Sequence, residues 1–177
     1  MGIDVEKKFA NMENDSERKV ARFLQKIGFT FVDSNSNFGE SLNELLGEID
    51  SLFTLDDYLF LIEVSDEKIS NEKKFTFFTK WADPDILDVI KNKYELRPKK
   101  IIRMYFDLYT QTPTINKSPL LQILTKAGKL NIVVYSDNYD SLVNSVTTAS
   151  EFLNRLDLLS YLKPEKTFKT ILRRFFR

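Results

Sequence analysis

Residues 47–65 of the chain read GEIDSLFTLDDYLFLIEVS, and this stretch decides the fold. It contains two apolar runs that flank the pair Asp56-Asp57. Apolar runs of this length around a two-residue polar pair are typical of a β-hairpin, although Asp-Asp is a weaker turn signal than Asn-Gly. The stretch therefore predicts two antiparallel strands joined by a turn at residues 56 and 57.

The turn also predicts which side chains meet across the hairpin. If Leu55 lies opposite Tyr58, four polar residues share one face in two opposed pairs, Asp50 with Glu63 and Glu48 with Ser65. Opposed Cβ atoms lie about 5 Å apart, and like charges at that distance destabilise a sheet. Glu63 also sits in the most apolar part of the chain, where burying a lone carboxylate is costly. A shared hard divalent cation is the simplest compensation, whereas a three-residue turn would separate the pair.

Outward from the hairpin, hydrophobic periodicity and capping residues predict an α/β fold. Helices are expected over residues 14–27, 42–46, 70–81, 83–94, 118–128 and 139–162, and strands over 29–32, 100–109 and 130–135. The last two strands are expected to be parallel with a right-handed crossover. We expect a single domain over residues 1–162, with a mixed central sheet, helices on both of its faces and an αβββαβ core. A basic, Phe-rich tail follows over residues 163–177.

Two residue types are missing from the 177 residues of the chain, Cys and His. A thiolate nucleophile, an imidazole base and a Cys- or His-ligated metal are therefore excluded. Any bound metal would have oxygen ligands, as Mg²⁺, Mn²⁺ and Ca²⁺ prefer. Acidic residues concentrate over residues 27–67, which contain no Lys or Arg, although the net charge is zero. The chain has no signal-peptide pattern and no apolar run of bilayer length, so we expect a cytoplasmic protein without a membrane partner.

The order of these features resembles that of the PD-(D/E)XK nuclease superfamily. The resemblance rests on a first helix with an early Glu17, the sequence GEID ending at Asp50, the hairpin, and Glu63 in an apolar strand. It covers about residues 15–135 and is closest to restriction-endonuclease-like, RecB-type and archaeal Holliday-junction-resolvase-like domains. It implies a nuclease that uses Mg²⁺ or Mn²⁺ to hydrolyse nucleic acid, with DNA expected rather than RNA. By the same resemblance, Glu17, Asp50 and Glu63 would bind the metal, and Glu48 would contribute through water.

One departure from the superfamily pattern concerns its lysine, which should stand two residues after Glu63. This chain has Ser65 there. Some members of the superfamily supply the lysine from the following helix, which nominates Lys73 or Lys74 and, less directly, Lys68. Other members have lost it and are inactive. The alternative function is therefore a catalytically inactive nucleic-acid-binding or assembly subunit, which the zero net charge also favours.

Further basic residues are candidates for contacts with the nucleic-acid backbone: Lys91, Lys93, Arg97, Lys99 and Lys100. The tail over residues 163–177 is expected to bind a protein partner or a second copy, because Phe residues beside Arg are typical of interface cores. Simpler interpretations stay open for the site. Glu17 could simply interact favourably with the dipole at a helix N-terminus. Asp50 could be a polar residue on an exposed strand face, and Lys73 and Lys74 could lie on the solvated side of a helix.

Overall fold

The computed structural model describes residues 9, 12, 14–35, 38–113, 123–124 and 129–162. Within these residues, six strands form one sheet in the order β1-β2-β3-β4-β6-β5. The strands are β1 (Thr30–Ser34), β2 (Ser51–Leu55), β3 (Tyr58–Ser65), β4 (Lys100–Asp107), β5 (Ile123–Leu124) and β6 (Lys129–Tyr135). β3, β4 and β6 run parallel, and the other neighbouring strands are antiparallel. The sheet is therefore mixed, as the sequence predicts.

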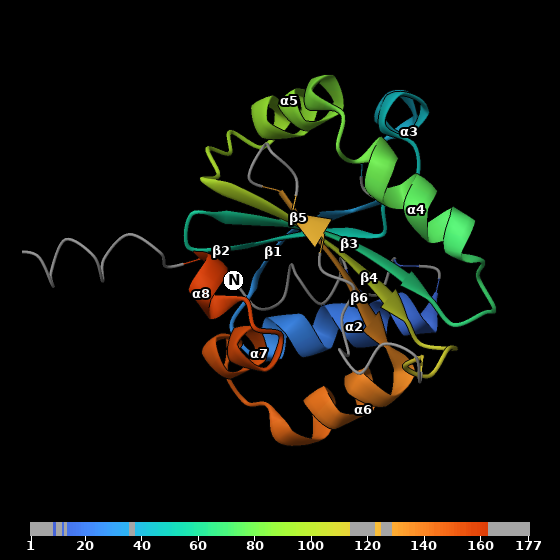
Figure 1. The fold of residues 1–177 in the computed structure, drawn as a ribbon. Helices are drawn as coiled ribbons and strands as arrows, with labels where there is room; N and C mark the ends of the chain where they lie inside the picture. The colour runs from blue at the N-terminus through green and yellow to red at the C-terminus, as the bar shows by residue number, and fades with distance from the viewer. Residues whose placement is uncertain are drawn as a thin grey trace, which may run out of the picture.

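Helices cover both faces of this sheet, which confirms the predicted α/β architecture. They are α2 (Asp15–Lys26), α3 (Glu40–Leu46), α4 (Asn71–Lys80), α5 (Pro84–Lys93), α6 (Ser136–Ser145), α7 (Ala149–Arg155) and α8 (Leu159–Leu162). Figure 1 shows α3, α4 and α5 over one face, and α2, α6 and α7 over the other. Among the residues that the structure describes, no helix is both long enough and apolar enough to cross a bilayer.

Helices α2, α4 and α5 each begin at a capping residue that the sequence contains. The Asn14 side chain accepts a hydrogen bond from the Ser16 N–H at 2.7 Å at the start of α2. Ser70 caps α4 in the same way, and Asp83 caps α5 with Pro84 in its first turn. Each cap satisfies an N–H group that has no partner inside the helix. α2 ends before Gly28, which has φ +113°.

The hairpin of β2 and β3 has the predicted two-residue turn. Leu55 pairs with Tyr58, and the pairing continues as far as Ser51 opposite Ile62. Asp56 adopts φ +50° in the turn, a left-handed conformation that Asp tolerates better than most residues. The turn therefore fixes the side to which every residue of the hairpin points.

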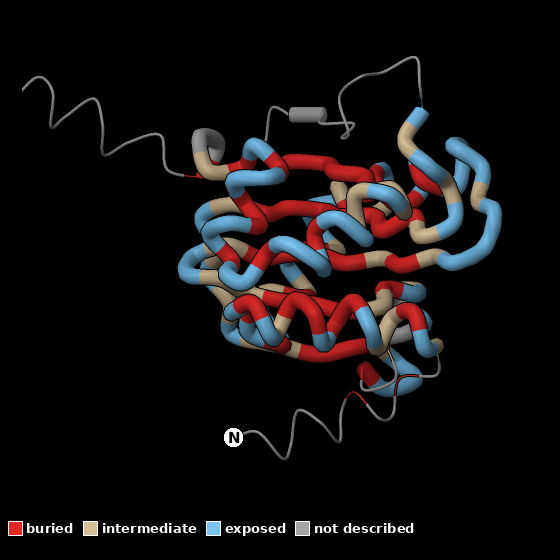
Figure 2. The backbone as a smooth tube through the Cα atoms, turned by 90° about the horizontal axis from the view of Figure 1, so that it is seen from below, coloured by how far each residue is buried: buried red, intermediate tan, exposed pale blue. Residues whose placement is uncertain are grey.

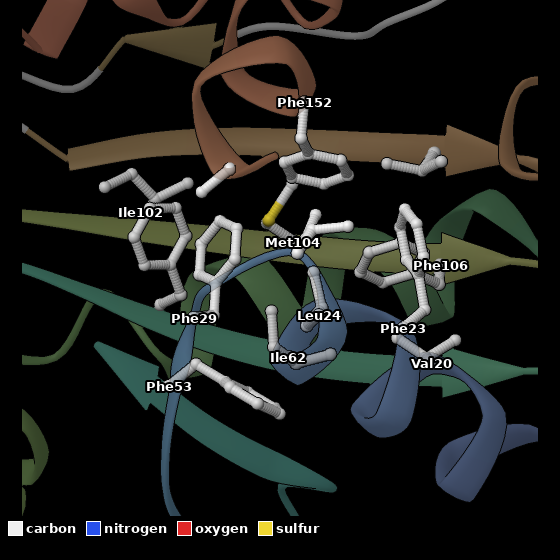
Figure 3. Packing of buried hydrophobic residues seen from close by; sticks show 14 of the residues in the cluster. Val20, Phe23, Leu24, Phe29, Phe53, Ile62, Ile102, Met104, Phe106 and Phe152 are labelled. Carbon is white, nitrogen blue, oxygen red and sulfur yellow. The ribbon is translucent and has the colours of Figure 1, made fainter. Parts of the chain in front are cut away.

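Both faces of the sheet are buried, so the central strands read as continuous apolar runs. Figure 2 shows the strands as the most buried part of the chain, while the outer turns of the helices are exposed. On the face of the sheet that α2 covers, buried apolar side chains form one cluster. In Figure 3, Val20 and Leu24 of α2 lie among Ile62, Met104 and other residues of this cluster. On the opposite face, a second cluster contains residues of the strands and of α4 and α5, including Leu52, Leu61, Phe77, Trp81, Leu87 and Tyr105.

The prediction of a helix over residues 118–128 is wrong where the structure describes that segment. Ile123 and Leu124 form the short strand β5, which pairs antiparallel with β6 through Asn131 and Leu130. The periodicity of a short apolar run does not distinguish a strand from a helix. Here residues 123–124 form a strand because they pair with the edge of β6. The other residues of that predicted helix lie outside the described residues, as does the tail over residues 163–177.

Candidate metal centre

Asp50 and Glu63 lie side by side where β3 ends. Asp50 directly precedes β2, and its Oδ2 atom accepts a hydrogen bond from the Val64 N–H at 2.6 Å. The Asp50 N–H in turn donates to the Glu63 carboxylate. The two carboxyl groups are thus held close together by the backbones of neighbouring strands, as the hairpin register predicts.

Glu17 reaches the same place from the first turn of α2. Its carboxyl group is hydrogen-bonded to that of Asp50, and this hydrogen bond adds to the factors that raise the pKa of Asp50. Ser16 fixes the start of the helix, because its hydroxyl donates to Asp66 Oδ2 at 2.6 Å in the loop after β3. The structure therefore brings together the three residues that the sequence nominates as metal ligands. A favourable interaction of Glu17 with the helix dipole is compatible with this position.

The proximity of these acids strongly perturbs their ionisation. Burial raises the pKa of Asp50 far above its usual range, and the nearby charges of Glu63 and Glu17 raise it further. Burial likewise raises the pKa of Glu63, with added contributions from Glu17 and Glu48, against an opposing effect of Lys80. Desolvation and like charge both disfavour the ionised form. The site therefore stabilises bound protons or, in their place, another cation.

The donor atoms of the site suit a hard divalent ion. Glu63 and Asp50 are both partly exposed, so the site is open to solvent. Glu63 Oε2, however, is buried and has no hydrogen-bond partner among the described residues. Carboxylate oxygens are the ligands that Mg²⁺ and Mn²⁺ prefer. In the described part of the chain, no three acidic side chains form a finished coordination group, so the structure shows converging carboxyl groups without an assembled metal shell.

Glu48 and Ser65 lie at the margins of the site. Glu48 is exposed, and its charge acts on Glu63. Ser65 is the residue that the resemblance aligns with the superfamily's lysine, and its hydroxyl donates to the Glu67 carbonyl at 3.2 Å. Ser65 also hydrogen-bonds Tyr105, which is the neighbour of Glu63 in the sheet. Burial raises the pKa of Tyr105 to about 12, and the charge of Glu63 adds to this effect.

The two lysines nominated from α4 have different positions. Lys73 is exposed. Lys74 is buried, and its Nζ atom forms an ion pair with Asp107 at the end of β4. Because Asp107 neighbours Ser65 in the sheet, Lys74 reaches the end of β4 beside Ser65. Its charge, however, is balanced by Asp107. Lys68, the weaker candidate, is exposed in the loop after β3.

Sequence reasoning missed Lys80, which lies at the end of α4. Its Nζ atom occupies the space that a Cβ atom at Gly47 would need, and it lies 5.3 Å from the ring centroid of Trp81. Its charge lowers the pKa of Glu63 against the larger effect of burial. One signal was present in the sequence: Lys80 follows the inward-facing Phe77 by three residues, so it borders the buried face of α4.

The predicted nucleic-acid contacts lie elsewhere on the surface. Lys91, Lys99 and Lys100 line a surface cavity beside the start of β4. β4 runs parallel to β3, so its start is at the opposite end of the sheet from Glu63. Lys93 donates to the Phe38 carbonyl at 3.1 Å, and Arg97 is exposed in the loop before β4.

Comparison of the chain with protein-family models, curated proteins and solved structures gave no match.

Proposed function

We propose that the chain is a metal-dependent nuclease of the PD-(D/E)XK type, which hydrolyses phosphodiester bonds in nucleic acid, DNA rather than RNA. The observation that carries this proposal is the hydrogen-bonded convergence of Glu17, Asp50 and Glu63 at one end of the sheet. Three ionised carboxylates in a partly desolvated place destabilise a fold unless protons or another cation neutralise them. The sheet order and the helix on each face also suit this superfamily.

The carboxyl groups of Asp50 and Glu63 would hold Mg²⁺ or Mn²⁺, with Glu17 completing the site. When bound, such an ion supplies Lewis-acid chemistry, which stabilises charge on the scissile phosphate and lowers the pKa of a water molecule. The Val64 N–H orients the Asp50 carboxyl group through Oδ2. Glu48, which is exposed beside the site, would act through water. The absence of Cys fits a reducing compartment such as the cytoplasm.

A cleavage assay with isosteric variants tests the proposal. The substrates are single-stranded, duplex and branched DNA and RNA, each incubated with Mg²⁺ or Mn²⁺. We expect Asp50→Asn and Glu63→Gln to reduce cleavage by at least about 100-fold, more than the loss of an outer partner would. Asp56→Asn is the matched control, since Asp56 is exposed at the opposite end of the same hairpin. Equal activity of the wild type and Asp50→Asn on every substrate would contradict the proposal.

The second candidate is an inactive nucleic-acid-binding or assembly subunit on the same fold. Two observations favour it: Ser65 replaces the motif lysine, and Asp107 balances the charge of Lys74. Calorimetry separates the two functions. A protein that binds DNA but gives no binding heat with Mg²⁺ or Mn²⁺ is the inactive subunit, whereas metal binding that disappears in Asp50→Asn supports the nuclease.

A further inference from the structure

The first turn of α2 carries two neighbouring side chains that bond to two different segments of the sheet. Glu17 is hydrogen-bonded to Asp50, which directly precedes β2. The Ser16 hydroxyl donates to Asp66 Oδ2 at 2.6 Å, and Asp66 is the first residue after β3. Asp66 also stands three residues beyond Glu63 in the sequence. The start of α2 is therefore joined to both of the segments that carry the other two acids of the site.

Ser16 does not cap its own helix, although a Ser near a helix N-terminus commonly does so. Asn14 has that role, because its side chain accepts a hydrogen bond from the Ser16 N–H at 2.7 Å. Ser16 is only 9% exposed, so its hydroxyl needs a partner within the protein. Asp66 supplies that partner from 50 residues further along the chain. A length of 2.6 Å is typical of hydrogen bonds from a hydroxyl to a carboxylate, which are stronger than those between neutral groups.

The three acids of the site differ in how the fold holds them. The backbone of the sheet holds Asp50 and Glu63 together, since the Val64 N–H donates to Asp50 Oδ2 at 2.6 Å. Glu17 belongs to no strand and stands in the first turn of a helix, where N–H groups lack partners within the helix and fraying is common. The buried apolar residues of α2 begin at Val20, about one turn further on. The position of Glu17 therefore depends on what holds the first turn, and the hydrogen bond from the preceding residue does this.

The charge of Asp66 offers a competing explanation for its place near the site. Its side chain is exposed, and no three acidic side chains form a coordination group among the residues that the structure describes. A positioning role needs only an acceptor oxygen at residue 66, whereas an electrostatic role needs the negative charge. Asparagine at this position retains an acceptor oxygen and removes the charge, whereas alanine removes both. The two roles therefore predict different results for the two substitutions.

We propose that Ser16 and Asp66 are positioning residues for Glu17: their hydrogen bond holds Glu17 beside Asp50 and thereby tightens the binding of a divalent ion at the carboxylate site. The effect on metal binding rests on the proposed nuclease function, and the effect on the position of Glu17 does not. Outer partners that orient a metal ligand typically change metal affinity by about 10- to 100-fold. Loss of this hydrogen bond should therefore weaken metal binding while every ligand stays chemically intact.

Calorimetry with Mn²⁺ alone tests the effect on metal binding. We expect Ser16→Ala and Asp66→Ala to bind Mn²⁺ about 10-fold more weakly than the wild type. Ser16→Thr retains the hydroxyl donor and Asp66→Asn retains an acceptor, so both should bind Mn²⁺ almost as tightly as the wild type. Thr148→Ala is the matched control, because Thr148 caps α7, whose Ala149 N–H donates to the Ile27 carbonyl at the far end of α2. This control should lower stability and leave the affinity for Mn²⁺ unchanged.

Three results of the calorimetry would overturn the proposal. Equal losses of affinity in Asp66→Asn and Asp66→Ala would show that Asp66 acts through its charge. Wild-type affinity in Ser16→Ala would show that the hydrogen bond does not matter for the site. A loss in Thr148→Ala as large as that in Ser16→Ala would show that a general decrease in stability weakens metal binding.

A measurement without metal decides the position of Glu17 even if the chain is not a nuclease. In the presence of EDTA, NMR of the ¹³C-labelled protein reports the side-chain carboxyl carbon of Glu17, which is assigned by its absence in Glu17→Gln. Ser16→Ala should move this resonance toward that of an exposed glutamate, and Asp66→Asn should leave it in place. An unchanged resonance in Ser16→Ala would overturn the proposal. Failure of the wild type to bind Mn²⁺ would refute the metal site, and the NMR result would still decide whether the hydrogen bond positions Glu17.

Discussion

Lys74 and Asp107 form a buried ion pair that joins helix α4 to the end of strand β4. Their side chains are 7% and 0% exposed. Asp107 Oδ1 also accepts hydrogen bonds from the N–H groups of Tyr109 and Thr110, at 3.2 and 2.9 Å. The pair therefore holds α4, and with it Lys80, against the end of the sheet where the carboxylate site lies.

Breaking this pair from one side should be strongly destabilising. Lys74→Met leaves the Asp107 carboxylate buried without its counter-ion, which should lower the free energy of unfolding by about 3 kcal/mol. The double variant Lys74→Met/Asp107→Asn removes both charges and should recover part of that loss. Urea denaturation of the three proteins measures both changes. A double variant less stable than the sum of the two single losses would contradict this account.

The same pair predicts how stability depends on pH in acid. Burial alone would raise the pKa of Asp107, but hydrogen bonds from Lys74 and Thr110 outweigh it and lower the pKa. A lowered folded-state pKa contributes stability above the ordinary carboxyl pKa, and this contribution is lost as the pH falls through the folded-state value. The stability difference between wild type and Asp107→Asn should therefore be constant above about pH 5 and shrink below it. Denaturation curves over this pH range provide the check.

Neutralising Asp50 or Glu63 should raise the stability of the metal-free protein, in contrast to the loss of the Lys74–Asp107 pair. The raised pKa values of Asp50 and Glu63 mean that the folded state retains protons that the unfolded state has lost, so metal-free stability falls as the pH rises above the ordinary carboxyl range. Asp50→Asn and Glu63→Gln should each stabilise the metal-free protein at neutral pH by about 1 kcal/mol, because solvent reaches both side chains and weakens the effect. Destabilisation by both substitutions at neutral pH, measured by urea denaturation, would indicate purely structural roles.

Metal binding should offset the loss of stability that the carboxylates of the site cause in the metal-free protein. At a Mn²⁺ concentration ten times its Kd, the wild type should gain about 1.4 kcal/mol of stability, or about 3–6 °C in the thermal midpoint of a chain of this size. EDTA should abolish the gain, and Asp50→Asn should show none. Thermal unfolding at constant pH measures it. A similar gain in Asp50→Asn would place the metal elsewhere on the chain.

The sequence predicted those parts of the site that depend on local pattern. The Asp56-Asp57 turn set the register of the hairpin, and the register brought Asp50 to Glu63. Lys80 could not be predicted in the same way, because its approach to Gly47 depends on where α4 packs on the sheet. The helical pattern likewise could not show that Lys74 finds Asp107, which is 33 residues away along the chain. Residues 123–124 were misassigned because pairing with β6 decides their conformation.

Under the proposed nuclease function, the position of Lys99 and Lys100 at the start of β4 has a consequence for substrate length. Lys100 is five residues before Tyr105, the strand neighbour of Glu63, and strand geometry makes that separation about 17 Å. A duplex rises about 3.4 Å per base pair, so an oligonucleotide that touches both the lysines and the carboxylates must extend over about five base pairs. Shorter oligonucleotides would have to bind with one of the two groups alone, and their affinity should respond less steeply to ionic strength.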